Sequence, residues 1–237
     1  IQRIAGLKKI VMELGSNSPV IVLSDADLED AVTSCVSGAF FASGQNCVGV
    51  KRIFVEAGVY DSFLNSFSQL TATLKIGSPL SEDIDIGPII SKESIHQIDK
   101  CIAESIAHGA KLIRGGKTIG NCYTPTILEA DCNNDIANCK EVFGPVVTIS
   151  KVKNLDQAIA NCNKSPFGLH TAIFTNAINN AHTAINELEC AGVMINDSTD
   201  YRIDAMPFGG VKSSGIGREG VKSAIEAMTE TKVVCFK

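Results

Sequence analysis

Short runs of β-branched and aliphatic residues alternate along this chain with longer segments in which apolar residues recur three and four positions apart. The short runs are typical of strands, and the longer segments are typical of amphipathic helices. Strands that alternate with helices indicate βαβ units. We therefore expect an α/β fold, a mostly parallel twisted sheet with flanking helices. The expected strands span residues 9–12, 20–23, 52–55, 111–114, 146–152, 171–174 and 192–195.

Helix signals occur in the segments between these strands. The clearest is SDADLEDAVTSCVSGAFFASG, in which Ser24, Asp25 or Asp27 is placed to cap the amino end and Gly44 ends the pattern. This helix delivers the following GQNC to a turn. The other expected helices lie within 59–74, 91–109, 154–165 and 180–192. Because no linker, repeat or low-complexity tract interrupts the pattern, we expect residues 1–237 to form one folded unit.

Composition narrows the class of protein. The chain has 237 residues, of which 45% are hydrophobic, so it can bury a full core. Its 26 acidic and 21 basic residues give a net charge of −5 and form no basic stripe, so no nucleic acid is expected as a partner. No apolar run reaches about 18 residues, and the N-terminus lacks the order of a secretory signal. We expect a cytoplasmic protein with no membrane contact.

The cysteines favour a reduced environment and single out one position. Nine cysteines occur without CxxC pairs in a chain much larger than disulfide-dependent domains, so no disulfide framework and no metal site are expected. Cys47 lies in FASGQNCVGVKR, among small and polar residues between a helix end and a strand, where backbone amides favour a reactive thiolate. Taken alone, a structural role explains Cys47 equally well. The cysteines for which packing is the simpler explanation lie in helical segments: Cys35, Cys101, Cys162 and Cys190.

Glu13 is the second candidate. It follows the apolar run KKIVM, so a carboxylate is expected where a strand ends, and active sites gather at the carboxyl ends of parallel strands. A solvated or capping carboxylate explains the same pattern when Glu13 is considered alone.

The two candidates together give a more specific pattern. MELG and GQNC place Glu13 and Cys47 34 positions apart, and the segments KEVFGP, PFGGVKSSG and GRE follow in order. This set resembles the base, nucleophile, cofactor-contacting and Gly-rich closing motifs of the aldehyde dehydrogenase superfamily, over nearly the whole chain. Within that superfamily the chain is similar to lactaldehyde and semialdehyde dehydrogenases.

The resemblance implies a covalent mechanism with NAD or NADP as cofactor. Cys47 would attack the aldehyde carbon to give a thiohemiacetal, and loss of hydride would leave a thioester. Glu13 would act as the general base that activates water to hydrolyse this thioester. The backbone N–H of Cys47 would stabilise the oxyanion.

The resemblance also implies roles for five further residues. Glu141 would bind the nicotinamide ribose, Phe143 would pack near the nicotinamide, and the Leu14 carbonyl would meet its amide. Phe208 would line the substrate tunnel, and Glu219 would relay protons from the base. A packing or ion-pair role remains open for each. Arg202, in DSTDYRIDAM, suggests small hydroxylated or anionic aldehydes, although a surface salt bridge explains it equally well.

Relatives in this superfamily are about twice as long, which implies a two-domain enzyme of which residues 1–237 form the catalytic domain. The N-terminal dinucleotide-binding domain and the second oxyanion donor are absent from this chain, and because the first residue is Ile1 we expect that an upstream part has been removed. The isolated chain is expected to be inactive as a dehydrogenase. The resemblance further implies a homodimer or homotetramer of the full-length enzyme, to which residues 231–237 would contribute an edge strand.

Two other classes of function remain open. In a thiol hydrolase or acyltransferase, Cys47 would need a histidine base. The candidates for that base are His96, His108, His170 and His182. In a non-catalytic binding domain, the fold would be kept without the chemistry. The sequence also contains a GxGxxG pattern, formed by Gly215, Gly217 and Gly220. It is not a dinucleotide-binding motif, because it does not follow a strand.

Overall fold

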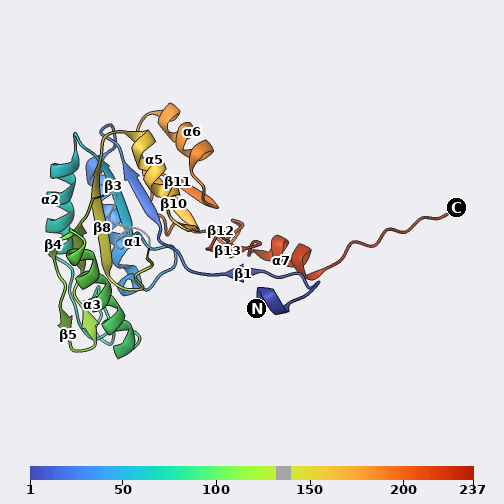
Figure 1. The fold of residues 1–237 in the computed structure, drawn as a ribbon, viewed down its shortest axis with the longest axis horizontal. Coiled ribbons are helices and arrows are strands. Elements are labelled where there is room, and N and C mark those ends of the chain that lie inside the picture. Colours follow the sequence, from blue (N-terminus) through green and yellow to red (C-terminus); the bar gives the residue numbers. More distant parts are fainter. Residues whose placement is uncertain (132–139) are drawn as a thin grey trace.

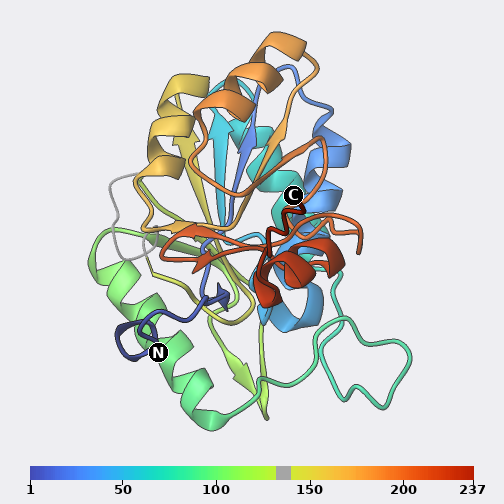
Figure 2. The same ribbon diagram turned by 90° about the vertical axis from the view of Figure 1, so that its right-hand side faces the viewer.

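The computed structural model describes residues 1–131 and 140–237, and a seven-stranded sheet forms its centre (Figures 1 and 2). Neighbouring strands are parallel except at one edge, where β4 runs antiparallel to β7. In spatial order the strands are β11 (Gly192–Ile195), β10 (His170–Phe174), β2 (Pro19–Val22), β3 (Arg52–Glu56), β8 (Val146–Val152), β7 (Thr126–Glu129) and β4 (Lys111–Arg114). This arrangement confirms the expected α/β fold with a mostly parallel sheet.

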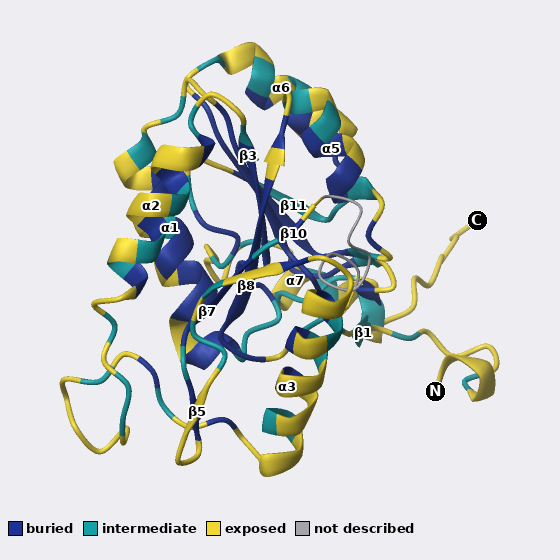
Figure 3. Cartoon of the chain, turned by 60° about the vertical axis from the view of Figure 1, so that its left-hand side comes forward, coloured by how far each residue is buried: buried dark blue, intermediate teal, exposed yellow. Residues whose placement is uncertain are grey.

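Helices cover both faces of this sheet. The helices α1 (Leu28–Phe40) and α2 (Tyr60–Thr71) pack on one face, and α5 (Leu155–Asn163) and α6 (Ile178–Glu187) pack on the other. The helix α3 (Lys92–Ala107) packs near the β7 and β8 end. Figure 3 shows the central strands buried along their length, with the helices exposed on their outer sides.

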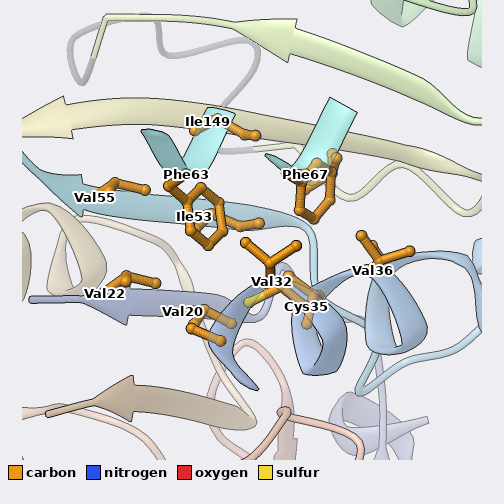
Figure 4. Packing of buried hydrophobic residues seen from close by; sticks show 14 of the residues in the cluster. Val20, Val22, Val32, Cys35, Val36, Ile53, Val55, Phe63, Phe67 and Ile149 are labelled. Atoms are coloured by element: carbon orange, nitrogen blue, oxygen red, sulfur yellow. The ribbon is translucent and has the colours of Figure 1, made fainter. Parts of the chain in front are cut away.

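Side chains of the central strands alternate between two cores. Val20 and Val22 point toward α1 and α2, whereas Ile21 points toward α5 and α6. Figure 4 shows Val20 and Val22 with Phe63 and Phe67 of α2 in the first core. Because both faces are covered, both sets of positions must be apolar. The strands therefore appear in the sequence as continuous apolar runs.

The helix α1 ends in an irregular turn. Asp27 caps its amino end by accepting hydrogen bonds from the amides of Glu29 and Asp30, so Asp27 is the cap among the three expected. After Phe40 the 3₁₀ segment η2 (Phe41–Gly44) contains Ala42 at φ +51° and Ser43 at φ +59°, left-handed values that cost energy for residues with a Cβ. Surrounding contacts must hold this turn, which leads directly to Cys47.

Short elements outside the main sheet bring the two ends of the chain together. The strand β1 (Met12–Glu13) pairs with β13 (Gly215–Ile216), and the helix α7 (Val221–Met228) lies beside them (Figures 1 and 2). The remaining short elements are η1 (Gln2–Ile4), β5 (Thr118–Ile119), β6 (Cys122–Tyr123), β9 (Phe167–Gly168) and β12 (Val211–Lys212). None of the described helices combines the length and the apolar content needed to cross a bilayer.

The expected strand at 9–12 is wrong. Only Met12 and Glu13 form a strand, because β13 offers two residues for pairing. Lys9, by contrast, pairs with Glu230 at 3.0 Å near the other end of the chain. The other expected strands and helices are confirmed within a few residues, whereas β7 and α7 were not anticipated.

The backbone at Gly44 gives a testable prediction. Gly44 has φ +67°, and a Cβ there would collide with the carbonyl of Gly144, whereas Gly120 has φ +60° with nothing within 4 Å of an added Cβ. We expect Gly120→Ala to lower the free energy of unfolding by about 1–2 kcal/mol, the cost of a left-handed alanine. Gly44→Ala should cost about 1–3 kcal/mol more, because the overlap adds to that strain. Urea denaturation of both variants measures the difference, and equal losses would contradict the close approach.

Candidate active site

The candidate residues lie at the amino edge of the parallel sheet. Glu13 and Leu14 precede β2, Cys47 precedes β3, and Glu141 and Phe143 precede β8. Since β2, β3 and β8 are neighbours, these three segments meet at one edge. Glu13 does end a strand, as expected, but this strand, β1, pairs antiparallel with β13 outside the parallel sheet, so the expected place at the carboxyl end of a parallel strand is wrong.

Cys47 lies half-buried in the turn between η2 and β3. It packs against the buried side chains of Val48, Leu169 and Phe208. The turn is held from outside, since the hydroxyl of Thr199 donates to the Val48 carbonyl at 2.6 Å. The sulfur thus has an apolar wall on one side and a fixed backbone.

The charge around Cys47 differs from the expectation. Burial raises the pKa of its thiol, and the Glu13 carboxylate raises it further. Hydrogen bonds from the amides of Cys47 and Val48 lower this pKa, as expected for such a turn, but Glu141 raises it again and the net direction is upward. A thiol in this state needs a base to accept its proton. The Glu13 carboxylate, far away in sequence, therefore lies close enough to Cys47 to act on its charge.

Glu13 is positioned by β1 and surrounded by glycines. A Cβ on Gly209 would lie 3.2 Å from the Glu13 carboxylate oxygen, and one on Gly215 would lie 3.5 Å from it. Burial raises the pKa of the Glu13 carboxyl, and Glu219 raises it further, against a backbone hydrogen bond from Gly210. Arg202 and Arg218 also oppose the rise. A raised pKa suits a group that must accept and release protons.

Phe208, Arg202 and Glu219 form one cluster beside Glu13. The guanidinium of Arg202 lies 4.0 Å from the centre of the Phe208 ring and 3.4 Å from a carboxylate oxygen of Glu219. The backbones of Phe208 and Glu219 are paired by an antiparallel bridge. The predicted substrate-pocket and relay residues therefore lie together, and Phe208 also contacts Cys47.

His170 is a neighbour of this cluster that the sequence did not place. Its ring meets Phe208 edge-on with centroids 5.3 Å apart, and its Nδ1 lies 2.8 Å from the Thr199 carbonyl oxygen. Burial lowers the pKa of His170, which favours its neutral form, and the ring packs against Phe208. Within residues 1–131 and 140–237, no hydrogen bond joins Cys47 to a histidine, and the groups outside its own turn that shift its pKa are carboxylates.

Glu141 and Phe143 lie on the α3 side of Cys47. The Glu141 carboxylate accepts a hydrogen bond from the Ser16 amide at 3.0 Å, and Phe143 is 47% exposed. A cavity of about 400 Å³ is lined by 140–143 and by α3 residues. Leu14 is 45% exposed, and its amide donates to the Ser214 carbonyl at 3.0 Å. An accessible aromatic ring, a fixed carboxylate and a cavity suit part of a nucleotide.

Lys51 is a site residue that the sequence analysis missed. Its ammonium is buried and donates hydrogen bonds to the carbonyls of Gly44 and Gly144. Burial lowers the pKa of Lys51 to about 8, although Glu141 opposes the change. The available signal was a lysine two positions before the continuous apolar run IFV, close to a strand that a two-sided sheet buries. Among the described residues, no three metal-binding side chains gather into a site.

The pKa of Cys47 gives a prediction that needs no substrate. Replacing Glu13 by glutamine removes a negative charge that opposes the thiolate, so Glu13→Gln should lower the pKa of Cys47. The rate of Cys47 alkylation by iodoacetamide, followed against pH by mass spectrometry of its peptide, should then reach half-maximum at a lower pH. Glu93→Gln, on the surface of α3, is the matched control and should leave the profile unchanged. An unchanged profile in Glu13→Gln would show that the two groups do not interact.

Comparisons with known proteins agree with this geometry. The chain matches the model of the aldehyde dehydrogenase family over residues 1–234. It is 49% identical over its whole length to an aldehyde-dehydrogenase-like protein of Sinorhizobium fredii, covering 46% of that protein. It is 47% identical to the lactaldehyde dehydrogenase of Methanococcus aeolicus, covering 99% of this chain and 50% of that protein.

Among solved structures, the glyceraldehyde-3-phosphate dehydrogenase of Methanocaldococcus jannaschii in complex with NADP superposes with a TM-score of 0.93 at 44% identity, over 96% of this chain and 49% of that one. The chain therefore spans about half the length of the relatives it matches. Since the family model extends over almost every residue, the chain belongs to the aldehyde dehydrogenase family.

Proposed function

We propose that residues 1–237 are the catalytic domain of an NAD(P)-dependent aldehyde dehydrogenase, with Cys47 as nucleophile and Glu13 as general base. The observation that carries this proposal is the interaction of the Glu13 carboxylate with the Cys47 thiol, across 34 positions of sequence. The raised pKa of Glu13 supports it, because a carboxylate with a raised pKa is a stronger base. The relatives named above support the reaction class.

The first step is addition of the sulfur to the aldehyde. Glu13 accepts the thiol proton of Cys47, and the sulfur forms a bond to the carbonyl carbon. The negative charge that develops on the oxygen is stabilised by the backbone N–H of Cys47, the donor this chain offers. Phe208 and Leu169 exclude water from one side of the sulfur. The product is a thiohemiacetal on Cys47.

The second half of the reaction returns Cys47 to its starting state. When bound, a nicotinamide dinucleotide would supply the acceptor for the hydride, and loss of that hydride would leave a thioester on Cys47. Glu13 then takes a proton from water, and the hydroxide adds to the thioester carbon and expels the Cys47 thiolate. Glu219, whose side chain is 45% exposed, is placed to pass protons from Glu13 to solvent.

Part of the cofactor site belongs to this chain. We assign the nicotinamide ribose to Glu141, the nicotinamide to Phe143, and its amide to the Leu14 carbonyl. The cavity of about 400 Å³ beside 140–143 supports this assignment. The remaining half of the enzyme would supply the dinucleotide-binding domain, so the isolated chain would not oxidise aldehydes. The full-length enzyme would assemble as a homodimer or homotetramer, with residues 231–237 in the contact.

The substrate would be a small hydroxylated or anionic aldehyde. Arg202 supports this proposal, because its guanidinium lies on the ring of Phe208 next to Cys47. The reported relatives act on lactaldehyde and on glyceraldehyde-3-phosphate, one hydroxylated and one anionic. Glu219 pairs with Arg202 and orients it toward the cluster.

The roles of Glu13 and Cys47 are separated by transient kinetics on the full-length enzyme. In Glu13→Gln the sulfur is kept, but the thiol must give its proton to solvent and the base for hydrolysis is lost, so we expect a slower burst of about one NAD(P)H per site, then turnover lowered about 100-fold or more. Cys47→Ala should show no burst, and Glu93→Gln should behave as the unaltered enzyme. Undiminished NAD(P)H formation by Cys47→Ala would overturn the proposal. Cysteine-dependent ester hydrolysis without any aldehyde oxidation would favour a thiol hydrolase.

The role of Arg202 is tested by substrate preference. Arg202→Ala should lower kcat/KM for an anionic aldehyde such as succinate semialdehyde about tenfold or more relative to neutral propionaldehyde, because a charge-assisted hydrogen bond is lost. The neutral aldehyde corrects for any general disturbance of Glu219 and Phe208. Arg202→Lys, which keeps the charge, should retain much of the preference. An unchanged ratio in Arg202→Ala would show that Arg202 serves only as an ion-pair partner of Glu219.

A further inference from the structure

Lys51 is a buried cation that the proposed reaction does not use. The residue is 4% exposed, so its ammonium has lost its water. Burying a charge is costly unless hydrogen bonds replace the hydration. Here the replacement comes from two backbone carbonyls, those of Gly44 and Gly144, with the second at 3.0 Å. A lysine held at this cost by two segments 100 positions apart calls for an explanation.

The two carbonyls belong to the two halves of the proposed site. Gly44 ends η2, three positions before Cys47, and Gly144 directly follows Phe143. The backbones of these segments touch, because a Cβ on Gly44 would collide with the Gly144 carbonyl. Two carbonyl oxygens that face the same point repel each other unless a donor lies between them. The ammonium of Lys51 is that donor.

The turn that carries Cys47 also depends on outside support. Three consecutive residues, Ala42, Ser43 and Gly44, have positive φ angles of +51°, +59° and +67°. Such a run persists only where surrounding contacts over-determine it. The hydroxyl of Ser43 supplies one contact, since it lies 3.0 Å from the Gly87 amide and 3.1 Å from the Gly87 carbonyl oxygen. Lys51 supplies a second contact. Unlike Ser43, it also reaches Gly144 in the segment of Glu141 and Phe143.

We propose that Lys51 is a positioning residue that fixes the separation between the turn of Cys47 and the segment of Glu141 and Phe143. The inference rests on the proposed function, in which the first segment holds the reacting carbon and the second contacts the cofactor. Hydride transfer requires the two segments at the right separation, whereas hydrolysis of an ester needs only Cys47 and Glu13. Loss of the ammonium therefore affects the first reaction more than the second.

The first test uses the cofactor-free protein. Lys51→Met keeps the length of the side chain and removes its donors, so amide hydrogen exchange should become faster in both 42–48 and 141–146. The matched control is Arg52→Met, because Arg52 is also a buried cation, and it donates to the carbonyls of Asn17 at 2.9 Å and Asn161 at 3.3 Å. That variant should leave 141–146 unchanged. Unchanged exchange at 141–146 in Lys51→Met would overturn the proposal.

The second test compares two reactions of the full-length enzyme. In Lys51→Met the hydride-transfer burst should slow about tenfold to a hundredfold, the effect of a misplacement near 1 Å. Cofactor-free hydrolysis of p-nitrophenyl acetate should change much less. In Arg52→Met the ratio of the two rates should stay as in the unaltered enzyme. Equal losses of both reactions in Lys51→Met would overturn the proposal.

If Lys51→Met does not fold, a second variant tests the same proposal. Gly44→Ala leaves Lys51 intact but forces the two segments apart, and it should produce the same difference between hydride transfer and ester hydrolysis. Gly120→Ala, with a similar φ and no close contact, should not. A wrong proposed function is distinguished from a wrong role of Lys51 by Cys47→Ala. That variant would still form NAD(P)H if the proposed function were wrong. An inactive Cys47→Ala with an unchanged ratio in Gly44→Ala would overturn the role of Lys51 alone.

Discussion

Both faces of the central sheet are covered by helices, and this constraint decides where the polar chemistry of the chain can lie. Strands such as β2 and β3 must be apolar on both sides, since one set of positions packs on α1 and α2 and the other on α5 and α6. Polar side chains with a chemical role are thereby restricted to the ends of the strands and the segments that join them. The candidates Glu13, Cys47 and Glu141 lie at the amino ends of the strands, in the segments that lead into β2, β3 and β8.

The electrostatics of that edge follow from its crowding. Three carboxylates, of Glu13, Glu141 and Glu219, act on the same small volume, and two of them raise the pKa of the Cys47 thiol. Arg202 and Lys51 provide compensating positive charge. Arg202 lowers the pKa of Glu13, and Lys51 interacts with Glu141. The Glu13 and Glu141 carboxylates thus oppose ionisation of the Cys47 thiol.

The sequence was sufficient for elements defined by local physics. Helix caps such as Asp27, Ser91 and Asn154 occur where their side chains accept backbone hydrogen bonds, and apolar runs match the buried strands. The helix α7 was missed although its apolar residues Val221, Ile225 and Met228 recur at helical spacing, and in this chain that apolar face is exposed. The strand expected at 9–12 failed because strand formation needs a partner, which lies about 200 positions away.

For the site, local sequence and tertiary contacts contributed differently. Cys47 and Glu13 were identified through the spacing of family motifs, and neither stood out alone. The cluster of Arg202 with Phe208 and Glu219 depends on chain segments that meet only after folding. Lys51 was missed because its partners are backbone carbonyls, which leave no trace in the identity of residues 44 and 144 beyond the small size of glycine.

The pairing of β1 with β13 joins only two residues from each strand, and it stands apart from the seven-stranded sheet. Such a ribbon opens locally at a smaller free-energy cost than the unfolding of a buried core. Glu13 is mounted on this ribbon, whereas Cys47 is anchored to β3 in the core. Detachment of the ribbon would therefore move the Glu13 carboxylate away from the Cys47 thiol while the seven-stranded sheet stays folded.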